Sequence, residues 1–317
     1  MKPSIRVAVT GAGGFCGSHI AASAAAAGMD VICVGRRPGP TGRHVPWDAA
    51  RHLPDLAGAD VVIHCAAAVG DPAPGSRAEA RMRAVNVDGT TRLLEAARGR
   101  PVVWVSSASV YDPHTDRGRI REDHPVARQL NAYGRTKAAG ERLALAAGAV
   151  VLRPRAVYGP GDPHLLPRLR DRVRAGTLLL PGPDVRLSLT AVENLTDACL
   201  AAGGWTPGAY NIADAVPYGR DDAVRRVLGA HGVRVRVRHL PLGPATAAAR
   251  AMETLSRLPT APEPTLTRYA LDQLAHPVVL DVTRAREQGW EPRRTLDDYV
   301  RAVASGRSPG QRNALPA

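Results

Sequence analysis

The fold is decided by the stretch Thr10-Gly11-Ala12-Gly13-Gly14-Phe15-Cys16-Gly17. A β-type run at residues 5–9 precedes it, and a run of small, helix-forming residues at 18–27 follows it. A strand, a glycine-rich turn and a helix in this order are typical of the βαβ unit that binds dinucleotides. The glycines allow a tight turn and close backbone packing, and the helix N-terminus attracts phosphates. We therefore predict a cofactor site, rather than an ordinary turn, formed by Gly11, Gly13, Gly14, Phe15 and Gly17.

The residues after the second strand indicate which dinucleotide binds. The strand Val31-Ile32-Cys33-Val34 is followed by Gly35-Arg36-Arg37, where NAD-binding proteins usually present an acid to the ribose hydroxyls. Guanidinium groups can hold a phosphate through paired hydrogen bonds. Arg36 and Arg37 therefore predict NADP(H) rather than NAD(H), unless both are simply solvated loop charges. Asp48, near the end of the third strand, is expected either to meet the adenine amine or to cap the next helix.

Two further strands end in residues suited to the same site. The run Val61-Val62-Ile63-His64-Cys65-Ala66-Ala67-Ala68 ends in small side chains, so Ala66 and Ala67 are expected to leave room for a cofactor ribose. His64 has the chemistry of a base, but its place at the end of a buried strand favours a packed histidine. The apolar run at 102–105 leads into Ser106, Ser107 and Ser109. Ligands of open parallel sheets bind beyond the carboxyl ends of the strands, so one of these serines is expected to face the site.

A tyrosine and a lysine stand four residues apart in Asn131-Ala132-Tyr133-Gly134-Arg135-Thr136-Lys137. The residues that follow are good helix formers, and positions i and i+4 of a helix share one face. An ammonium group beside a phenol favours the phenolate and lowers the phenol's pKa from about 10. Tyr133 and Lys137 therefore predict a proton donor and acceptor usable near neutral pH. The alternative is an exposed helix that merely carries both residues.

Together these motifs resemble the extended short-chain dehydrogenase/reductase family, the NAD(P)-dependent epimerase/dehydratase group. The resemblance covers about residues 5–215, and it also rests on Asn86-Val87-Asp88-Gly89-Thr90, Leu152-Arg153-Pro154, Val192-Glu193-Asn194 and Tyr210-Asn211-Ile212. It implies an α/β protein with a doubly wound parallel Rossmann sheet and a smaller C-terminal substrate domain. It also implies that Ser107, Tyr133 and Lys137 are catalytic. In that family role, Ser107 binds the substrate oxygen and Tyr133 transfers the proton, while Lys137 lowers the Tyr133 pKa and binds the nicotinamide ribose.

The resemblance also divides the chain. It implies an NADP-binding Rossmann domain at residues 1–165, to which residues 187–213 return. Residues 166–304 then form mainly the substrate-binding domain. Residues 305–317 are rich in Gly, Ser and Pro and predict a flexible tail.

Departures from the family's patterns narrow the expected activity. Members that eliminate water carry an Asp-Glu pair where this chain has Ala108 and Ser109, so a dehydratase is not expected. Members that act on nucleotide sugars often place a diphosphate-binding arginine where Leu187 stands, and Arg186 lies on the opposite face of a strand. These departures and NADP(H) favour a ketoreductase acting on a secondary alcohol or ketone. The alternative is a nucleotide-sugar 4-epimerase or 4-ketoreductase working through a keto intermediate. The retained Ser-Tyr-Lys set argues against a non-enzymatic redox sensor.

The C-terminal third says less about the substrate. Candidate substrate contacts are Ser109, Tyr158, His164 and Arg168, and for the last three, packing or a solvated loop is an equal alternative. The alternating run Val233-Arg234-Val235-Arg236-Val237-Arg238 predicts a half-buried strand whose arginines form a solvated edge.

Composition limits the expected partners. The chain has 317 residues and a net charge of +13, but its arginines are scattered rather than grouped, which argues against nucleic acid. Its four cysteines show no metal-binding spacing, so we expect no metal and a reducing cytoplasm. No apolar run is long enough to span a membrane. We expect a cytoplasmic enzyme with a small-molecule substrate, either anionic or a sugar nucleotide, and we leave a homodimer open.

Overall fold

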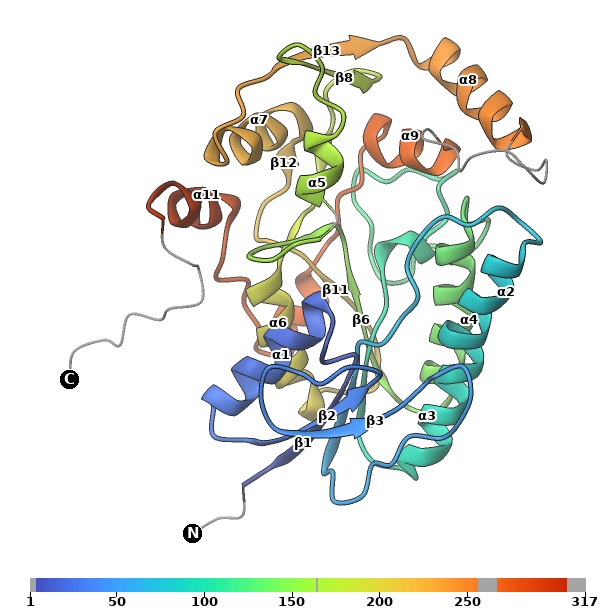
Figure 1. Ribbon diagram of the computed structural model, residues 1–317, viewed down its shortest axis with the longest axis vertical. Helices are drawn as coiled ribbons and strands as arrows, with labels where there is room; N and C mark the ends of the chain where they lie inside the picture. Colours follow the sequence, from blue (N-terminus) through green and yellow to red (C-terminus); the bar gives the residue numbers. More distant parts are fainter. Residues whose placement is uncertain (1–3, 164, 256–266, 307–317) are drawn as a thin grey trace.

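The computed structural model describes residues 4–163, 165–255 and 267–306 (Figure 1). The described residues are built around a seven-stranded sheet in the order β11-β6-β5-β4-β1-β2-β3, whose neighbouring strands all pair in parallel. The central strands are continuous apolar runs because helices cover both of their faces. The strands are β1 (Arg6–Thr10), β2 (Asp30–Gly35), β3 (Arg43–Pro46), β4 (Val61–His64), β5 (Val102–Val105), β6 (Val150–Pro154) and β11 (Gly208–Ile212).

Two layers of helices enclose this sheet, as Figure 1 shows. On one face, α1 (Phe15–Ala26) packs beside α6 (Val192–Ala201). The other face carries α4 (Ala132–Ala146) and a continuous helical stretch of α2 (Arg77–Arg83), a π-helical turn (Ala84–Asp88) and α3 (Gly89–Ala97). This strand order with helices on both faces is that of a doubly wound α/β fold, so the predicted fold class is confirmed.

The core is split by the sheet, because successive side chains of a strand point to opposite faces. Val7 and Val9 of β1 belong to the cluster under α1 and α6. Ala8, between them, belongs to the cluster under α3 and α4. The parallel register places Val9 beside Cys33 of β2 and Ile63 of β4. All carboxyl ends of the strands therefore open toward the same side of the molecule, where the site is expected.

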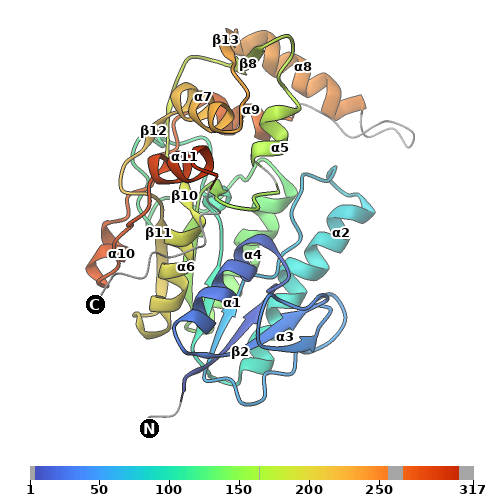
Figure 2. The same cartoon turned by 60° about the vertical axis from the view of Figure 1, so that its left-hand side comes forward.

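A smaller lobe lies at one end of the sheet (Figure 2). Two of its helices, α5 (Leu165–Arg170) and α9 (Arg268–Ala275), are not expected from the sequence. The other C-terminal helices are α7 (Arg220–Ala230), α8 (Leu242–Leu255), α10 (Thr283–Glu287) and α11 (Leu296–Ala304). Three two-stranded sheets accompany these helices. Two are parallel: β7 (Val157–Tyr158) with β10 (Thr190–Ala191), and β8 (Thr177–Pro181) with β13 (Arg236–Leu240). The third, β9 (Arg186–Leu187) with β12 (Tyr218–Gly219), is antiparallel.

The alternating arginine run lies at β13 and just before it. Val233, Val235 and Val237 pack against the small apolar cluster of this lobe, whereas Arg234, Arg236 and Arg238 are exposed. The arginines thus form the solvated edge that their alternation predicts.

A buried ion pair ties α4 to the sheet. The Arg153 guanidinium lies 2.5 Å from the Glu141 carboxylate, and both side chains are almost fully buried. Ser106 donates to Glu141 at 2.5 Å, and Arg153 donates to the Tyr111 hydroxyl at 2.9 Å. Tyr111 in turn donates to Asn211 of β11 at 2.6 Å. The hydroxyl of Ser106 is therefore used inside the fold, which leaves Ser107 and Ser109 as the serines able to face the site.

The chain leaves the sheet at β6 and returns to its edge at β11. The division into domains stays a prediction, and residues 307–317 of the expected tail lie outside the described residues. Within the described ranges, no helix combines the length and the apolar character needed to cross a membrane.

Candidate functional site

The glycine loop forms a tight turn between β1 and α1. Gly11 has a φ of +70°, and its N–H donates to the carbonyl oxygen of Val34 at 2.8 Å. A Cβ atom on Gly17 would lie 2.3 Å from the carbonyl oxygen of Gly11. Only glycine therefore lets α1 pack this closely on the turn, as the glycine spacing predicts.

The N-terminus of α1 is open. Gly14 is its N-cap residue and offers no side chain to the first N–H groups, and the first turn has no acidic residue. Such a helix end presents backbone donors and a partial positive charge to an anion. Gly13 and Phe15 flank this point, and the Phe15 ring packs edge-on against His19 with centroids 5.5 Å apart. A nucleotide diphosphate therefore fits this end of the helix.

Two exposed arginines follow β2. Arg37 donates from Nη2 to the carbonyl oxygen of Gly13 at 3.0 Å, so its guanidinium lies against the glycine loop. The Arg36 side chain makes no hydrogen bond or ion pair with any other described residue. The end of β2 thus presents guanidinium groups beside the loop, and no acid directly follows the strand.

Asp48 follows β3 but has a local role in the backbone. Its Oδ1 accepts from the Ala50 N–H at 3.0 Å, and its Oδ2 lies 3.2 Å from Arg51. A turn rather than a helix begins there. The predicted helix-capping role is therefore wrong, because Asp48 stabilises a turn instead, and its contact with an adenine amine stays a prediction.

The end of β4 lies against the glycine loop. A Cβ atom on Gly11 would lie 2.8 Å from the backbone nitrogen of Ala66. Thr10 accepts at its Oγ1 from the N–H groups of Cys65 and Ala66, at 3.2 Å each. Ala66 and Ala67 are only partly buried, so their small side chains leave accessible backbone beside the loop, as expected for a ribose site.

His64 is a packed residue, as predicted. It is 1% exposed, stacks against Trp104, meets Trp47 edge-on, and shares a 2.8 Å hydrogen bond with the Thr10 hydroxyl. Burial lowers the pKa of His64 to about 3, and the charge of Lys137 acts in the same direction. His64 is therefore neutral near pH 7.

Ser107 and Ser109 lie where β5 ends. Ser107 is the N-cap of a short 3-10 helix (Ala108–Val110), and its Oγ accepts from the Ser109 N–H at 3.2 Å. The two hydroxyl oxygens are 3.0 Å apart, with Ser107 donating to Ser109. Ser109 also shares a 2.8 Å hydrogen bond with the hydroxyl of Tyr269, on α9. The structure thus brings both serines together with a tyrosine from the smaller lobe.

Lys137 is buried on α4 beneath the end of β5. Its Nζ donates to the carbonyl oxygen of Val105 at 2.7 Å and lies 3.7 Å from the centroid of the Trp104 ring. Burial lowers the pKa of Lys137 to about 7, although Cys65 and Glu141 act in the opposite direction. Lys137 is therefore only partly protonated near neutral pH.

Tyr133 lies one turn before Lys137 on α4, whose N-cap Asn131 accepts from the Gly134 N–H at 2.8 Å. The pKa of Tyr133 is raised, opposite to the predicted direction. Burial is the main cause, and Tyr269 and Cys16 add to it, while a hydrogen bond with Ser107 opposes it. Burial favours the uncharged form of both the phenol and the amine, so a partly protonated Lys137 does not offset it. Tyr133 is thus held as a phenol that can donate a proton.

Asn86 links the segment after β4 to helix α4. Its Oδ1 accepts from the Ala68 N–H at 2.7 Å, and its Nδ2 donates to the Ala68 carbonyl and to Thr136, both at 3.0 Å. It lies in the π-helical turn, a feature common at functional sites. The motif around Asn86 marked the segment, but the sequence did not show that Asn86 ties β4 to α4.

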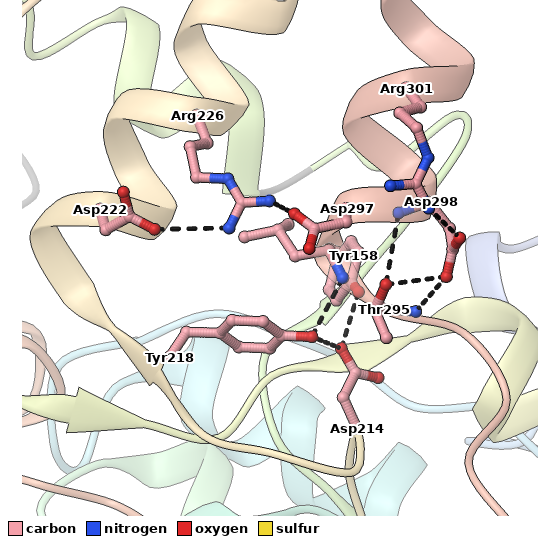
Figure 3. Close-up of polar contacts among 10 residues, drawn as sticks. Tyr158, Asp214, Tyr218, Asp222, Arg226, Thr295, Asp297, Asp298 and Arg301 are labelled. Carbon is pink, nitrogen blue, oxygen red and sulfur yellow. Dashed lines mark hydrogen bonds and ion pairs between the residues drawn. The ribbon is translucent and has the colours of Figure 1, made fainter.

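Tyr158 is placed in a structural network rather than an open site (Figure 3). It is 2% exposed, and its hydroxyl donates to Asp214 at 2.7 Å. Tyr218 donates to the same carboxylate at 3.0 Å, and the backbone N–H of Leu296 donates to Tyr218 at 3.0 Å. These contacts support the structural packing role that the sequence left open for Tyr158, rather than contact with a substrate.

The structure says less about Arg168 and His164, the remaining candidate substrate contacts. Arg168 is exposed on α5, and its charge acts on Asp71 in the loop after β4. His164 lies outside the described residues. Tyr269 is the residue near Ser107 that the sequence did not reveal, because it belongs to no motif and follows a proline-rich stretch.

Comparison with known proteins agrees with this geometry. A family model described as the NAD dependent epimerase/dehydratase family matches residues 7–213. The chain is 30% identical to a 4-hydroxy-2-methyl-3-oxo-4-farnesyl-3,4-dihydroquinoline-1-oxide ketoreductase of Stigmatella aurantiaca, covering 98% of this chain and 99% of that protein. It is 29% identical to a 2-alkyl-3-oxoalkanoate reductase of Stenotrophomonas maltophilia, covering 94% and 98%. Among solved structures, MoeE5 in complex with UDP-glucose and NAD is similar, with a TM-score of 0.71 and 25% identity over 95% of this chain and 98% of that one.

The family match spans about two thirds of the chain and includes the glycine loop, the serines after β5 and the Tyr-Lys helix. The chain therefore belongs to the NAD dependent epimerase/dehydratase family and is an NAD(P)-dependent oxidoreductase or epimerase of the extended short-chain dehydrogenase/reductase type.

Proposed function

We propose that this protein is an NADP(H)-dependent ketoreductase acting on a secondary alcohol or ketone, with Ser107, Tyr133 and Lys137 as its catalytic residues. The observation that carries the proposal is the meeting of Ser107, at the end of β5, with the Tyr133 hydroxyl on the helix that also carries Lys137. A positioned, protonated phenol is the acid that reduction of a carbonyl requires. The names of two relatives that align along nearly the whole chain, a ketoreductase and a reductase, support the same direction.

The choice of NADP(H) rests on the end of β2. Exposed Arg36, and Arg37 bonded to Gly13, could both reach a 2′-phosphate, and no acid there would repel it. Asp48 also stays a candidate contact for the adenine amine, since its carboxylate is partly exposed beside a turn. When bound, the nicotinamide supplies or accepts the hydride. The residues that would hold the cofactor are Gly11, Gly13, Gly14, Phe15, Gly17, Arg36, Arg37, Ala66, Ala67 and Lys137.

Each of the three catalytic side chains has a separate task. Ser107 would turn its hydroxyl from Ser109 and donate to the substrate oxygen. Tyr133 would give its proton to that oxygen as the alcohol forms. The Lys137 ammonium would stabilise the charge that develops on Tyr133, and it would also bind the ribose.

The architecture suggests how the lobes share this work. We infer that residues 1–165 and 187–213 bind the cofactor and that residues 166–304 mainly bind the substrate. All four cysteines are free thiols, which supports a reducing cytoplasmic location.

The second candidate is a nucleotide-sugar epimerase or 4-ketoreductase, which the likeness to MoeE5 with UDP-glucose and NAD favours. The segment expected to grip a diphosphate argues against it. Leu187 is 6% exposed, whereas Arg186 is exposed and donates to the carbonyl oxygen of Pro217 at 3.0 Å.

Purified enzyme separates the two activities. With NADPH and a panel of ketones, we expect NADPH to be consumed in proportion to the alcohol formed. Tyr133→Phe should lower kcat by roughly 100-fold or more, since it removes the general acid. Epimerisation of UDP-sugars without net use of NADPH would overturn the proposal in favour of the second candidate.

A further inference from the structure

The hydroxyl of Tyr269 reaches the catalytic region from the smaller lobe. It lies 2.8 Å from Ser109 Oγ, which itself accepts from Ser107 at 3.0 Å. Ser109 and Tyr269 are both partly buried, and Tyr269 also acts electrostatically on Tyr133. A continuous row of three hydroxyl groups therefore runs from Ser107 to α9.

The helix that carries Tyr269 is held firmly in place. Arg117 donates two hydrogen bonds of 2.8 Å to the Asp272 carboxylate, one from each terminal nitrogen. Arg155, which follows β6 and is 6% exposed, donates to the carbonyl oxygen of Gln273 at 3.0 Å. Asp272 and Gln273 are three and four residues after Tyr269, so all three share one helix face. Two buried arginines thus fix the face from which Tyr269 projects.

One hydroxyl proton in this row has no acceptor within the row. Ser109 and Tyr269 have one hydroxyl proton each, and their mutual hydrogen bond uses one of these two protons. Ser109 also accepts the Ser107 proton. The second proton, on Ser109 or on Tyr269, is therefore left to donate one further hydrogen bond to a bound acceptor.

The spacing of the serine hydroxyls matches a particular kind of substrate. In a β-dicarbonyl compound the two oxygens can approach to about one hydrogen-bond length, as the closed enol form shows. The oxygens of Ser107 and Ser109 are separated by the same kind of distance, 3.0 Å. One carbonyl oxygen could then bind Ser107 while the second binds the Ser109–Tyr269 pair.

We propose that Ser109 and Tyr269 form a second oxygen-binding position, and that the enzyme therefore selects 3-oxo esters, acids and similar β-dicarbonyl compounds over plain ketones. This inference rests on the proposed ketoreductase function and deepens it by naming the substrate class. It adds no chemical step, because hydride and proton still reach the ketone that binds Ser107. Tyr269 is a positioning residue for the second oxygen, and its loss should act on binding more than on the reaction itself.

A matched pair of ketones tests this selection. Ethyl 3-oxobutanoate and 2-heptanone have chains of equal length, but only the first carries a second carbonyl. We expect the wild-type enzyme with NADPH to show a kcat/KM at least about tenfold higher for the keto ester, the worth of one good hydrogen bond. Tyr269→Phe should reduce this ratio toward one, mainly by raising KM for the ester.

Two further variants keep the test sharp. Ser109→Ala should reduce the ratio like Tyr269→Phe, whereas Ser109→Thr, which retains a hydroxyl, should restore it. The double variant Ser109→Ala/Tyr269→Phe should lose no more than either single one, since both act on one hydrogen bond. Tyr210→Phe is the matched control. It also removes a tyrosine hydroxyl, but this one lies on β11 and donates to the carbonyl oxygen of Thr206 rather than to a serine of the site.

The outcomes separate this inference from the function on which it rests. If wild-type enzyme reduces neither ketone, the proposed function fails and the inference falls with it. If it reduces both, and the ratio is the same in wild type, Tyr269→Phe and Ser109→Ala, only the inference is overturned. Should Tyr269→Phe fail to fold, the comparison of Ser109→Ala with Ser109→Thr decides alone.

Discussion

Arg37 donates a hydrogen bond of 3.0 Å to the carbonyl oxygen of Gly13. The contact fastens the end of β2 to the glycine loop, and it leaves the rest of the guanidinium exposed. One side chain can therefore shape the loop and meet a phosphate at the same time. Its neighbour Arg36 has only the second task open to it, and this difference can be measured.

We expect Arg36→Ala to weaken NADPH binding roughly 10- to 100-fold, the worth of a hydrogen bond to a charged group. NADH binding should change little, because NADH lacks the 2′-phosphate. Arg37→Ala should weaken both cofactors, since it also frees Gly13. Titration of each protein with both cofactors measures these constants. Arg142→Ala, which removes an exposed charge from α4, is the control. Equal losses for NADPH and NADH in Arg36→Ala would contradict the choice of NADP(H).

The buried Lys137 predicts a pH-dependent stability. The pKa of this lysine is 10.5 in the unfolded chain and about 7 in the folded one, because burial disfavours the ammonium. Between these values the unfolded state binds the extra proton, so the free energy of unfolding rises with pH, by at most about 1.4 kcal/mol per pH unit.

Lys137→Met should lack this component. Urea denaturation of cofactor-free protein from pH 7 to pH 9.5 measures it as the difference between the two proteins. Other groups titrate equally in both, so they cancel. Parallel curves for wild type and Lys137→Met would show that Lys137 keeps an ordinary pKa.

Two glycine substitutions compare the steric cost of an added Cβ atom with the gain from a less flexible unfolded chain. Gly17→Ala places a Cβ atom 2.3 Å from a carbonyl oxygen, so we expect it to destabilise the fold by about 1–3 kcal/mol and to weaken cofactor binding. Gly229→Ala, in α7, meets nothing within 4 Å and should stabilise the protein by roughly 0.5–1 kcal/mol. Thermal denaturation gives both changes. A neutral Gly17→Ala would mean that the loop can open without cost.

The Glu141–Arg153 pair is expected to matter for stability rather than for catalysis. Arg153→Met leaves a buried carboxylate without its partner and should cost about 3–5 kcal/mol in the free energy of unfolding. Glu141→Leu/Arg153→Met should cost less than Arg153→Met alone. Arg301→Met, at an exposed pair with Asp298, should cost less than about 1 kcal/mol. Chemical denaturation of the three variants orders them, and a larger loss in the double variant would refute the argument.

The fold and much of the candidate site could be predicted from the sequence, because both depend on patterns within short segments. The glycine loop, the apolar strands and the Tyr133–Lys137 spacing are local patterns, and a parallel sheet brings the ends of its strands together by topology alone. The same reasoning correctly gave His64 a packed position. Local pattern thus sufficed wherever the partners were neighbours in the sheet.

What the sequence missed depends on contacts between distant segments. Tyr269 reaches Ser109 across 160 residues because Arg117 and Arg155 dock its helix. The hydroxyl of Tyr158 faces Asp214, 56 residues away. The direction of the Tyr133 pKa was wrong for a related reason: burial, which spacing does not reveal, outweighs the neighbouring amine.

The return of β11 to the sheet also limits how the protein can be rebuilt. β6 is buried along its whole length, and β11 covers its outer edge. A chimaera made by a single cut after β6, to import another C-terminal lobe, would replace β11 along with that lobe. Unless the donor supplied a matching strand, an apolar edge would be left bare, and such edges recruit strands from other molecules. Grafting a new specificity onto this scaffold therefore calls for segment exchange on both sides of β11, with that strand kept from the recipient.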